Sequence, residues 1–384
     1  MALKILVVDD EPQFERLISQ RFRRKIRAEE YQFEFALNGV EALEKLAQQE
    51  DIDVVLSDIN MPQMDGLTLL GRLKDRLDRT KVIMVSAYGD MDNIRVAMNK
   101  GAYDFVVKPI KFEDLSATIE KAQQEIIRIK EARRAKAKLS LMEKELAAAN
   151  TVQLSILPTD FKLLCANTNI DLFAKMLPAK GVGGDFYDCF RVDDDRLAIV
   201  IGDVSGKGMP AALFMAMCRT ILKATGLSGA SPEACLKQTN QLLCQDNREM
   251  MFITVFYGLL ELSTGQLTYC CAGHNPPLLL QNGTAQYLEE SKNIAVGIMP
   301  NTDYQSAHCT LATNDTLVLY TDGITEAEDA SEAYFGESRL TQWSLEHSAL
   351  HAEAFTTSLL DEVALFATGM PQADDTTLLV VKVK

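Results

Sequence analysis

The sequence has no hydrophobic run long enough to cross a membrane, although 47% of its 384 residues are hydrophobic. A membrane-spanning helix needs about 20 consecutive apolar residues. The N-terminus also lacks the basic region and the small-residue cleavage site of a signal peptide. We therefore expect a soluble, cytoplasmic protein with no membrane partner.

Cysteine is missing from the first 164 residues, and the eight cysteines lie scattered from Cys165 to Cys309. None forms a Cys-x-x-Cys pair, so buried, reduced thiols are expected rather than a zinc site. An excess of positive charge is also lacking, since 54 acidic residues outnumber 39 basic ones and the formal net charge is −15. A general nucleic-acid binder gains its affinity by neutralising phosphates, so we expect no nucleic-acid partner.

Proline and glycine are both absent between Phe112 and Ile156. Apolar residues recur there at spacings of three and four, which is typical of a long helix with a narrow apolar seam. A basic stretch from Arg128 to Lys138 interrupts the seam. The helix is either a solvated connection or a dimerising, signal-carrying coiled coil, and the second interpretation is favoured. We place this helical linker at 113–157. The seam residues are Leu115, Ile119, Ala122, Ile126 and Ile129, then Leu139, Met142, Leu146 and Ala149.

Residues 1–122 alternate short apolar runs with amphipathic stretches. This pattern predicts a doubly wound, flavodoxin-like α/β domain, in which helices cover both faces of a parallel sheet. Ligands bind beyond the C-terminal ends of such strands. Asp9 and Asp10 follow the first run and Asp58 follows the third, so their carboxylates are expected at one edge. Three acids so close together repel one another unless a cation lies among them, and oxygen ligands suit Mg²⁺. The apolar runs are 4–8, 32–36, 54–57, 82–85 and 105–107.

These residues closely resemble the receiver domain of two-component response regulators. The matching elements are Val-Val-Asp9-Asp10-Glu11, Ser-Asp58-Ile-Asn60-Met-Pro62-x-Met-Asp65-Gly66, Ser86-Ala87 and Lys108-Pro109. The resemblance implies that Asp58 accepts a phosphoryl group from a cognate sensor histidine kinase. It also implies that Asp9, Asp10, Asp58 and the Asn60 carbonyl bind Mg²⁺. Ser86, Phe105 and Lys108 would form the receiver switch, with a cis Lys108–Pro109 peptide bond.

Residues 160–384 change to strands separated by Gly, Asn and Asp turns, which predicts an α+β domain with two sheets packed face to face. Aspartate stands beside glycine or a second aspartate at several expected strand ends. A single Asp-Gly is an ordinary turn, but four acidic strand ends indicate a site. Oxygen ligands of this kind suit two Mg²⁺ or Mn²⁺ ions, which can activate a water for attack on a phosphate ester. The segments are Gly183-Gly184-Asp185-Phe-Tyr-Asp188, Gly202-Asp203-Val204-Ser-Gly206-Lys-Gly208, Thr321-Asp322-Gly323 and Asp374-Asp375-Thr376-Thr377.

The same region resembles the PPM family of metal-dependent protein phosphatases, specifically its sporulation-type, SpoIIE-like branch. The resemblance includes Gln153-Leu-Ser-Ile-Leu-Pro158, Ala272-Gly273-His274-Asn275-Pro276-Pro277 and the closing Asp374-Asp375-Thr376. It implies a β-sandwich flanked by helices, with catalytic metal ligands Asp203, Asp185, Asp322 and Asp374. Asp203 would bridge two ions, one shared with Asp185 and the Val204 carbonyl and the other with Asp322 and Asp374. Asp188, Gly323 and Asp375 would lie next to these ligands.

Two questions about this second site stay open: the role of His274 and the residue that binds the substrate phosphate. His274 is either a general acid or, as its Pro-rich turn favours, a structural residue. No arginine precedes Asp185 where the eukaryotic branch binds phosphate, and Lys175 or Lys180 are the candidates to replace it.

The leading hypothesis is a response regulator that removes phosphate from phosphoserine or phosphothreonine of a partner protein, gated by phosphorylation of Asp58. The family resemblance suggests an anti-sigma-factor antagonist as that substrate, and the seam suggests a homodimer. The alternative is a catalytically inactive adaptor that binds a partner when the receiver is phosphorylated.

Overall fold

The computed structural model describes residues 2–49, 51–87, 90–245, 247–289 and 293–384. The chain forms two compact units, Met1–Leu141 and Met142–Lys384. No helix within the described ranges has both the length and the apolar character needed to cross a membrane.

The first unit is built on a five-stranded, fully parallel sheet in the order β2-β1-β3-β4-β5. The predicted runs all form strands, so the doubly wound fold class is confirmed. Along β1, Leu3, Ile5 and Val7 pack on one face, and Leu6 and Val8 pack on the other, as the period of two in a strand requires. The strands are β1 Leu3–Val8, β2 Tyr31–Ala36, β3 Val54–Asp58, β4 Lys81–Ala87 and β5 Asp104–Lys108.

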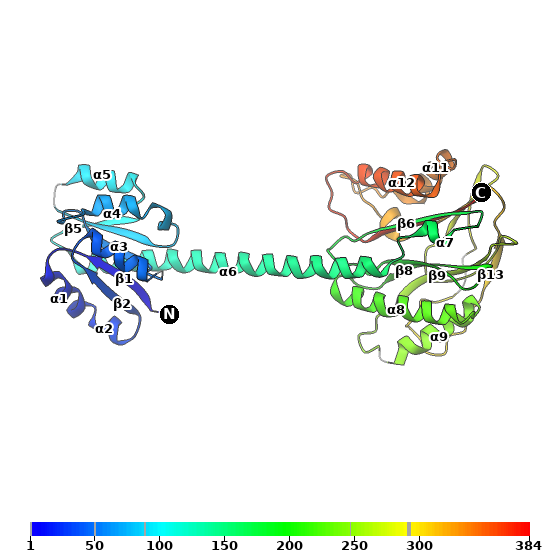
Figure 1. Cartoon of the computed structure of the whole chain (residues 1–384), viewed down its shortest axis with the longest axis horizontal. Coiled ribbons are helices and arrows are strands. Elements are labelled where there is room, and N and C mark those ends of the chain that lie inside the picture. Colours follow the sequence, from blue (N-terminus) through cyan, green and yellow to red (C-terminus); the bar gives the residue numbers. More distant parts are fainter. Residues whose placement is uncertain (1, 50, 88–89, 246, 290–292) are drawn as a thin grey trace. The chain divides into compact units, whose positions relative to one another are not determined.

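Helices cover both faces of this sheet (Figure 1). One core joins the sheet to α1 and to the first turns of α6, and the other joins it to α3, α4 and α5. Asn38 begins α3 by accepting hydrogen bonds from the amides of Val40 and Glu41, and Asp65 begins α4 in the same way. The helices are α1 Pro12–Arg21, α2 Arg23–Arg27, α3 Gly39–Gln48, α4 Gly66–Arg72, a 3₁₀ turn at Lys74–Arg76, α5 Met91–Asn99 and α6 Phe112–Ile156.

Helix α6 is continuous over 45 residues. Its first seam residues, from Leu115 to Ile126, are buried in the core of the first unit. The basic stretch is partly engaged, because Lys130 forms an ion pair with Asp53 and Arg133 forms one with Asp78. It therefore holds the helix on the first unit rather than only facing solvent.

The second unit contains two five-stranded antiparallel sheets, in the orders β13-β10-β9-β8-β7 and β12-β11-β14-β15-β6. The strands of the first sheet are β7 Phe186–Arg191, β8 Arg196–Val204, β9 Ile253–Glu261, β10 Gln266–Ala272 and β13 Ala307–Thr310. Those of the second are β6 Ile170–Leu177, β11 Leu278–Gln281, β12 Thr284–Tyr287, β14 Thr316–Tyr320 and β15 Thr376–Val383.

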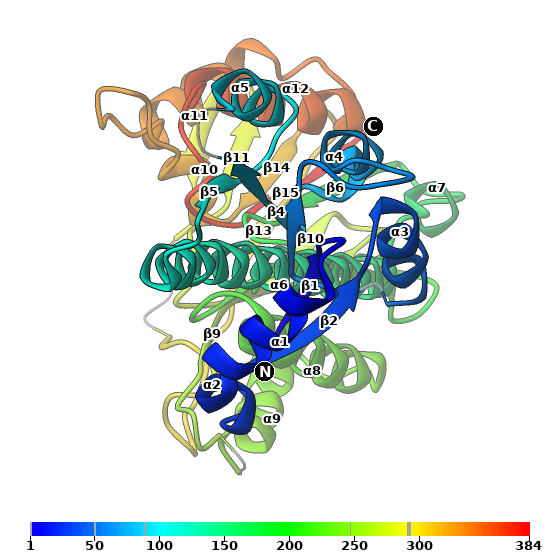
Figure 2. The ribbon, with the colours of Figure 1, turned by 90° about the vertical axis from the view of Figure 1, so that its left-hand side faces the viewer.

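Helices α8 and α9 lie on one side of this pair of sheets, and α11 and α12 lie on the other, as both views show (Figures 1 and 2). The sheets share one core: Leu317 and Leu319 of β14 point into it, whereas Val318 and Tyr320 point to α11 and α12. The predicted β-sandwich flanked by helices is confirmed. The helices are α7 Phe161–Leu164, α8 Met209–Leu227, α9 Pro232–Gln245, α10 Asp322–Thr325, α11 Gly336–Glu346 and α12 Ala352–Phe366.

Candidate functional sites

The three receiver acids meet at the C-terminal edge of the parallel sheet. Val8 of β1 pairs with Ser57 of β3, so the residues that follow come side by side. Among the residues that the structure describes, Asp9, Asp10 and Asp58 form the single group of potential metal ligands whose ligand atoms all lie within 4.8 Å of one another. Asp9 and Asp58 are buried and Asp10 is exposed.

Lys108 is the cation of this group. Its Nζ lies 2.7 Å from Asp58 Oδ2 and 3.2 Å from Asp9 Oδ2. Burial raises the pKa of Asp9, although the nearby Lys108 opposes the shift. Burial acts to lower the pKa of Lys108, but its bonds to Asp58 and Asp9 raise it overall. A single ammonium group beside three carboxylates leaves a net negative charge at this site. A Mg²⁺ ion bound by the carboxylate oxygens would balance that charge.

The backbone around Asp58 leaves no space for a larger residue at Gly66. A Cβ there would lie 2.1 Å from the Asp58 carbonyl oxygen. The amide of Ile59 donates to Asp58 Oδ1 at 2.7 Å and holds the carboxylate in place. Asn60 follows in the exposed loop, and its carbonyl stays a predicted ligand.

The predicted switch residues lie on adjacent strands. Ser86 is buried near the end of β4, where its Oγ is 3.4 Å from the carbonyl of Ala87. Phe105 is half-buried in β5. The Lys108–Pro109 peptide bond is cis, as the receiver resemblance implied. The switching roles themselves stay predictions.

The phosphatase acids lie at the ends of two pairs of antiparallel strands, β7 with β8 and β14 with β15. Phe186 pairs with Gly202, so Asp185 and Asp203 lie opposite each other at the open end of β7 and β8. Asp185 is 1% exposed, and its Oδ2 accepts hydrogen bonds from Thr321 Oγ1 at 2.6 Å and from Thr377 Oγ1 at 2.7 Å. Thr377 lies in β15 of the other sheet and Thr321 directly follows β14, so Asp185 links the two sheets.

The four acids are electrostatically coupled. Burial raises the pKa of Asp185 strongly, and the neighbouring Asp203 raises it further. Burial, followed by repulsion from Asp322, raises the pKa of Asp203 to about 7. The pKa of Asp322 is raised by burial and then by Asp374. Neighbouring like charges at a partly buried site are stabilised by cations, so the donor set fits divalent ions with oxygen ligands. Among the described residues, these four acids do not form a group whose ligand atoms all lie within 4.8 Å of one another, as the receiver acids do.

Asp375 holds the loop that carries Asp185. Its Oδ1 accepts from the amide of Ala179 at 2.8 Å, and its Oδ2 accepts from the amide of Gly184 at 2.7 Å. A Cβ at Gly183 would lie 2.1 Å from Asp375 Oδ2, and one at Gly323 would lie 1.9 Å from the Asp375 carbonyl oxygen. Glycine at these two positions is therefore explained by close approach to Asp375.

Asp188 makes contacts on the other face of β7. It is 1% exposed and pairs with Arg219 Nη2 at 2.8 Å and Lys223 Nζ at 3.4 Å, both on α8. Asp185 directly precedes β7 and Asp188 lies within it, three residues later. Their side chains therefore point to opposite faces of the sheet. The predicted position of Asp188 next to the metal ligands is not supported by these contacts.

Gln153 is a site residue that the sequence pattern did not single out. It lies near the end of α6 and is 6% exposed. Its Nε2 donates to the Gly183 carbonyl at 2.6 Å, and its Oε1 accepts from the Gly183 amide at 3.1 Å. The linker helix thus binds the loop that leads into Asp185. The available signal was the position of Gln153 at the start of the run that ends at Pro158, which carries part of the family resemblance.

Lys207 is the second residue missed. Its Nζ lies 2.6 Å from Asp374 Oδ2 and 2.9 Å from the carbonyl of Ala373. Within the described ranges, this is the sole ion pair to any of the four phosphatase acids. Lys175 and Lys180, the candidates from the sequence, are both exposed and form no ion pair in those ranges.

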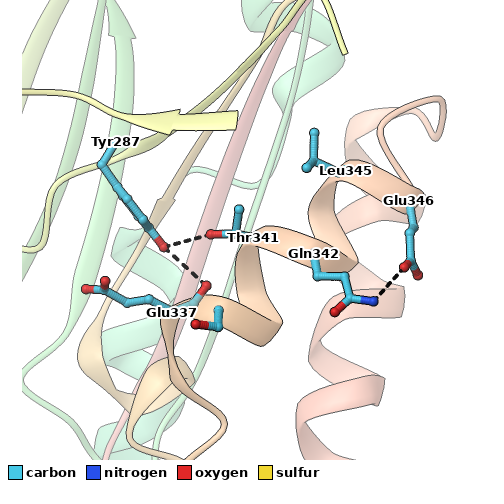
Figure 3. A pocket seen from close by; sticks show the side chains of 7 residues that line it. Tyr287, Glu337, Thr341, Gln342, Leu345 and Glu346 are labelled. Atoms are coloured by element: carbon cyan, nitrogen blue, oxygen red, sulfur yellow. Dashed lines mark hydrogen bonds between the residues drawn. The ribbon is translucent and has the colours of Figure 1, made fainter. Parts of the chain in front are cut away.

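A shallow pocket lies apart from these acids, between β12 and α11 (Figure 3). The Tyr287 hydroxyl is 3.2 Å from Thr341 Oγ1, and Gln342 donates to Glu346 at 2.9 Å. Four of its polar side chains are bonded to one another in pairs, and none of the site acids lines it, so we assign it no role. The lining residues are Tyr287, Glu337, Ser338, Thr341, Gln342, Leu345 and Glu346.

Comparison with known proteins agrees with both parts of the fold. The family model for Stage II sporulation protein E (SpoIIE) matches residues 193–384, and that for the response regulator receiver domain matches residues 5–120. The phosphoserine phosphatase RsbU of Bacillus subtilis is 31% identical over 244 residues, which cover 63% of this chain and 71% of RsbU. Sporulation initiation phosphotransferase F of B. subtilis is 34% identical over 118 residues, which cover 31% of this chain and 91% of that protein.

Two further similarities are more limited. Protein IcfG of Synechocystis is 31% identical over 231 residues, 53% of this chain, but the chain spans only 36% of IcfG. The SiaA-PP2C domain of Pseudomonas aeruginosa superposes with a TM-score of 0.58 at 22% identity, covering 65% of this chain and 99% of that domain, which supports the fold.

The fold and the two sites define a response regulator with a PPM-type phosphatase domain as its output. The chain belongs to the Stage II sporulation protein E family and carries an N-terminal receiver domain.

Proposed function

We propose that this chain is a metal-dependent protein serine/threonine phosphatase whose activity is set by phosphorylation of Asp58. The observation that carries the proposal is the convergence of Asp185, Asp203, Asp322 and Asp374 at the ends of the two paired strand sets, where the neighbouring carboxylates repel one another. Two Mg²⁺ or Mn²⁺ ions bound there would supply a water of lowered pKa as the nucleophile.

The residues of the chain have separate tasks in this proposal. Asp203 is close enough to Asp185, Asp322 and Asp374 for their charges to affect it, and it would be shared by the two ions. Asp185, with the Val204 carbonyl, would hold one of them, and Asp322 and Asp374 the other. Thr321 and Thr377 orient Asp185 through hydrogen bonds, which fixes the deepest ligand before any ion binds.

The substrate that we propose is a phosphoserine or phosphothreonine on a partner protein. RsbU, to which this chain is similar, is a phosphoserine phosphatase. An anti-sigma-factor antagonist is the partner that the family resemblance favours. The proposed phosphodonor for Asp58 is a sensor histidine kinase, with Mg²⁺ held by Asp9, Asp10, Asp58 and Asn60.

Helix α6 supports the proposed control. Its first turns belong to the receiver core, and its last turns carry Gln153, which binds Gly183 two residues before Asp185. A change in α6 would therefore reach the backbone that positions a metal ligand.

The test is Mn²⁺-dependent hydrolysis of an aryl phosphate by the full chain, with and without beryllofluoride as a phosphoryl mimic on Asp58. We expect activity that Asp203→Ala abolishes and that the mimic changes, with no effect of the mimic on Asp58→Ala. If the wild-type chain binds Mn²⁺ but hydrolyses nothing in either state, the phosphatase proposal is wrong and the adaptor is favoured.

A further inference from the structure

Lys207 lies at the rim of the acid cluster. Its side chain is 47% exposed and that of Asp374 is 37% exposed, whereas Asp185 at the floor is 1% exposed. The amine therefore faces the side from which a substrate in solution arrives. It reaches this place on a loop between Gly206 and Gly208, which have φ values of +91° and +76°.

The charge at the site calls for one more cation than the metal ions provide. Two divalent ions balance four carboxylates, so the loaded cluster would have no net positive charge for a phosphate dianion. A phosphate group in proteins is usually bound by arginine or lysine, and the four acids have no arginine partner within the described ranges.

The other candidate basic residues either pair elsewhere or form no ion pair with the four acids within the described ranges. Arg219 and Lys223 are paired with Asp188 on the opposite face of β7. Lys175 and Lys180 point to solvent without a partner among the described acids. Lys207 remains as the cation within reach of the place where the ions would lie.

We propose that Lys207 binds the phosphate of the substrate and determines its affinity, an inference that rests on the proposed phosphatase function. In the structure the amine pairs with Asp374. With Asp374 engaged by a divalent ion, the Lys207 ammonium group would be released from that carboxylate, and its flexible four-carbon stem would let it donate to a phosphate oxygen of the substrate.

The experiment compares the full chain with Lys207→Gln, Lys207→Arg, Lys180→Gln and Lys175→Gln. Lys162→Gln, an exposed lysine of α7, is the control for loss of one surface charge. Calorimetry measures the affinity for Mg²⁺ and then for inorganic phosphate on the Mg²⁺-loaded protein, and steady-state kinetics with a phosphoserine peptide separates KM from kcat.

We expect Lys207→Gln to weaken phosphate binding and to raise KM by about tenfold or more, the size of a lost charge-assisted hydrogen bond. Its Mg²⁺ affinity should be equal to or higher than that of the wild type, because a competing cation has left Asp374. Lys207→Arg should restore phosphate affinity, and Lys162→Gln should match the wild type.

Two results would overturn the assignment. Unchanged phosphate affinity in Lys207→Gln, or a loss that appears instead in Lys180→Gln or Lys175→Gln, would exclude Lys207 as the phosphate ligand. A parallel fall in Mg²⁺ affinity and melting temperature would show that Lys207 only supports the site. If the wild-type chain binds Mg²⁺ but has no hydrolysis at all, the failure lies with the phosphatase proposal instead.

Discussion

His274 lies in the core of the second unit with 7% of its surface exposed, and its Nδ1 is 3.0 Å from Thr254 Oγ1. Burial lowers the pKa of His274 to about 4, so the ring is neutral at pH 7. A general acid must hold its proton at the working pH. The environment therefore favours the structural role that its Pro-rich turn predicted.

This burial predicts how stability depends on pH. The unfolded chain protonates His274 near pH 6.5, whereas the folded chain does so near pH 4. The unfolded state thus holds more protons between these values, and stability is lost as pH falls through this window. Between about pH 7 and pH 4, we expect the free energy of unfolding to fall in the wild type by about 2–3 kcal/mol more than in His274→Gln.

Denaturant unfolding followed by the fluorescence of Trp343, the one tryptophan of the chain, measures this difference in the second unit. Asp185 and Asp203 contribute a slope of opposite sign in both proteins, so their effect cancels in the comparison. The exposed His308 is the matched control, and His308→Gln should follow the wild type. Parallel curves for the wild type and His274→Gln would contradict the prediction.

Single residues also show where sequence reasoning stops. Acids at strand ends can be located because each is marked by a neighbouring glycine or acid and an apolar run. Gln153 cannot be found in this way, because its partner Gly183 is 30 residues away and the pairing depends on how α6 meets a loop. Lys207 was missed for the same reason, since its partner Asp374 lies far along the chain, just before β15.

At the scale of elements, periodicity predicted the strands of the receiver and the long helix α6. Parallel strands linked by helices have few alternative orders, so the fold class followed from the pattern. The order of the strands in the two sheets of the second unit could not be predicted from the sequence pattern. β6 and β15 pair along their whole length from opposite ends of the domain, and nothing in either strand specifies the other.

The contact between α6 and the loop before Asp185 gives a prediction for an element. Gln153→Leu removes both hydrogen bonds to Gly183 and leaves a buried amide and carbonyl without partners. We expect about 1–3 kcal/mol lower stability of the second unit and a hydrolysis rate that no longer responds to beryllofluoride on Asp58. Unfolding and the aryl phosphate assay measure the two effects separately.

Glu145→Ala is the control on the same helix, since Glu145 is exposed and removed from Gly183. It should keep both the stability and the response of the wild type. If Gln153→Leu is less stable but still responds fully to the mimic, the bond to Gly183 is structural and the signal takes another route.

At the scale of the whole molecule, part of the apolar seam of α6 is exposed, and contacts within a single chain do not account for it. Leu139 and Met142 are 57% and 48% exposed, although their spacing is that of a coiled-coil seam. An isolated helix gains little stability from its own residues, and most of it comes from packing of an apolar face. We therefore expect a second copy of the chain to cover this seam.

Met142→Glu tests the expected dimer, because it would place two like charges against each other in the apolar seam. Leu141→Glu adds the same charge at a position that is 58% exposed but outside the seam, and so serves as its control. Sedimentation equilibrium over a range of concentrations should show a dimer for the wild type and Leu141→Glu, and at least tenfold weaker association for Met142→Glu, the equivalent of about 1.4 kcal/mol.

If the two variants associate equally, the seam is not the interface. If the weakened variant is also insensitive to the mimic on Asp58, receiver phosphorylation acts through the geometry of the dimer rather than within one chain.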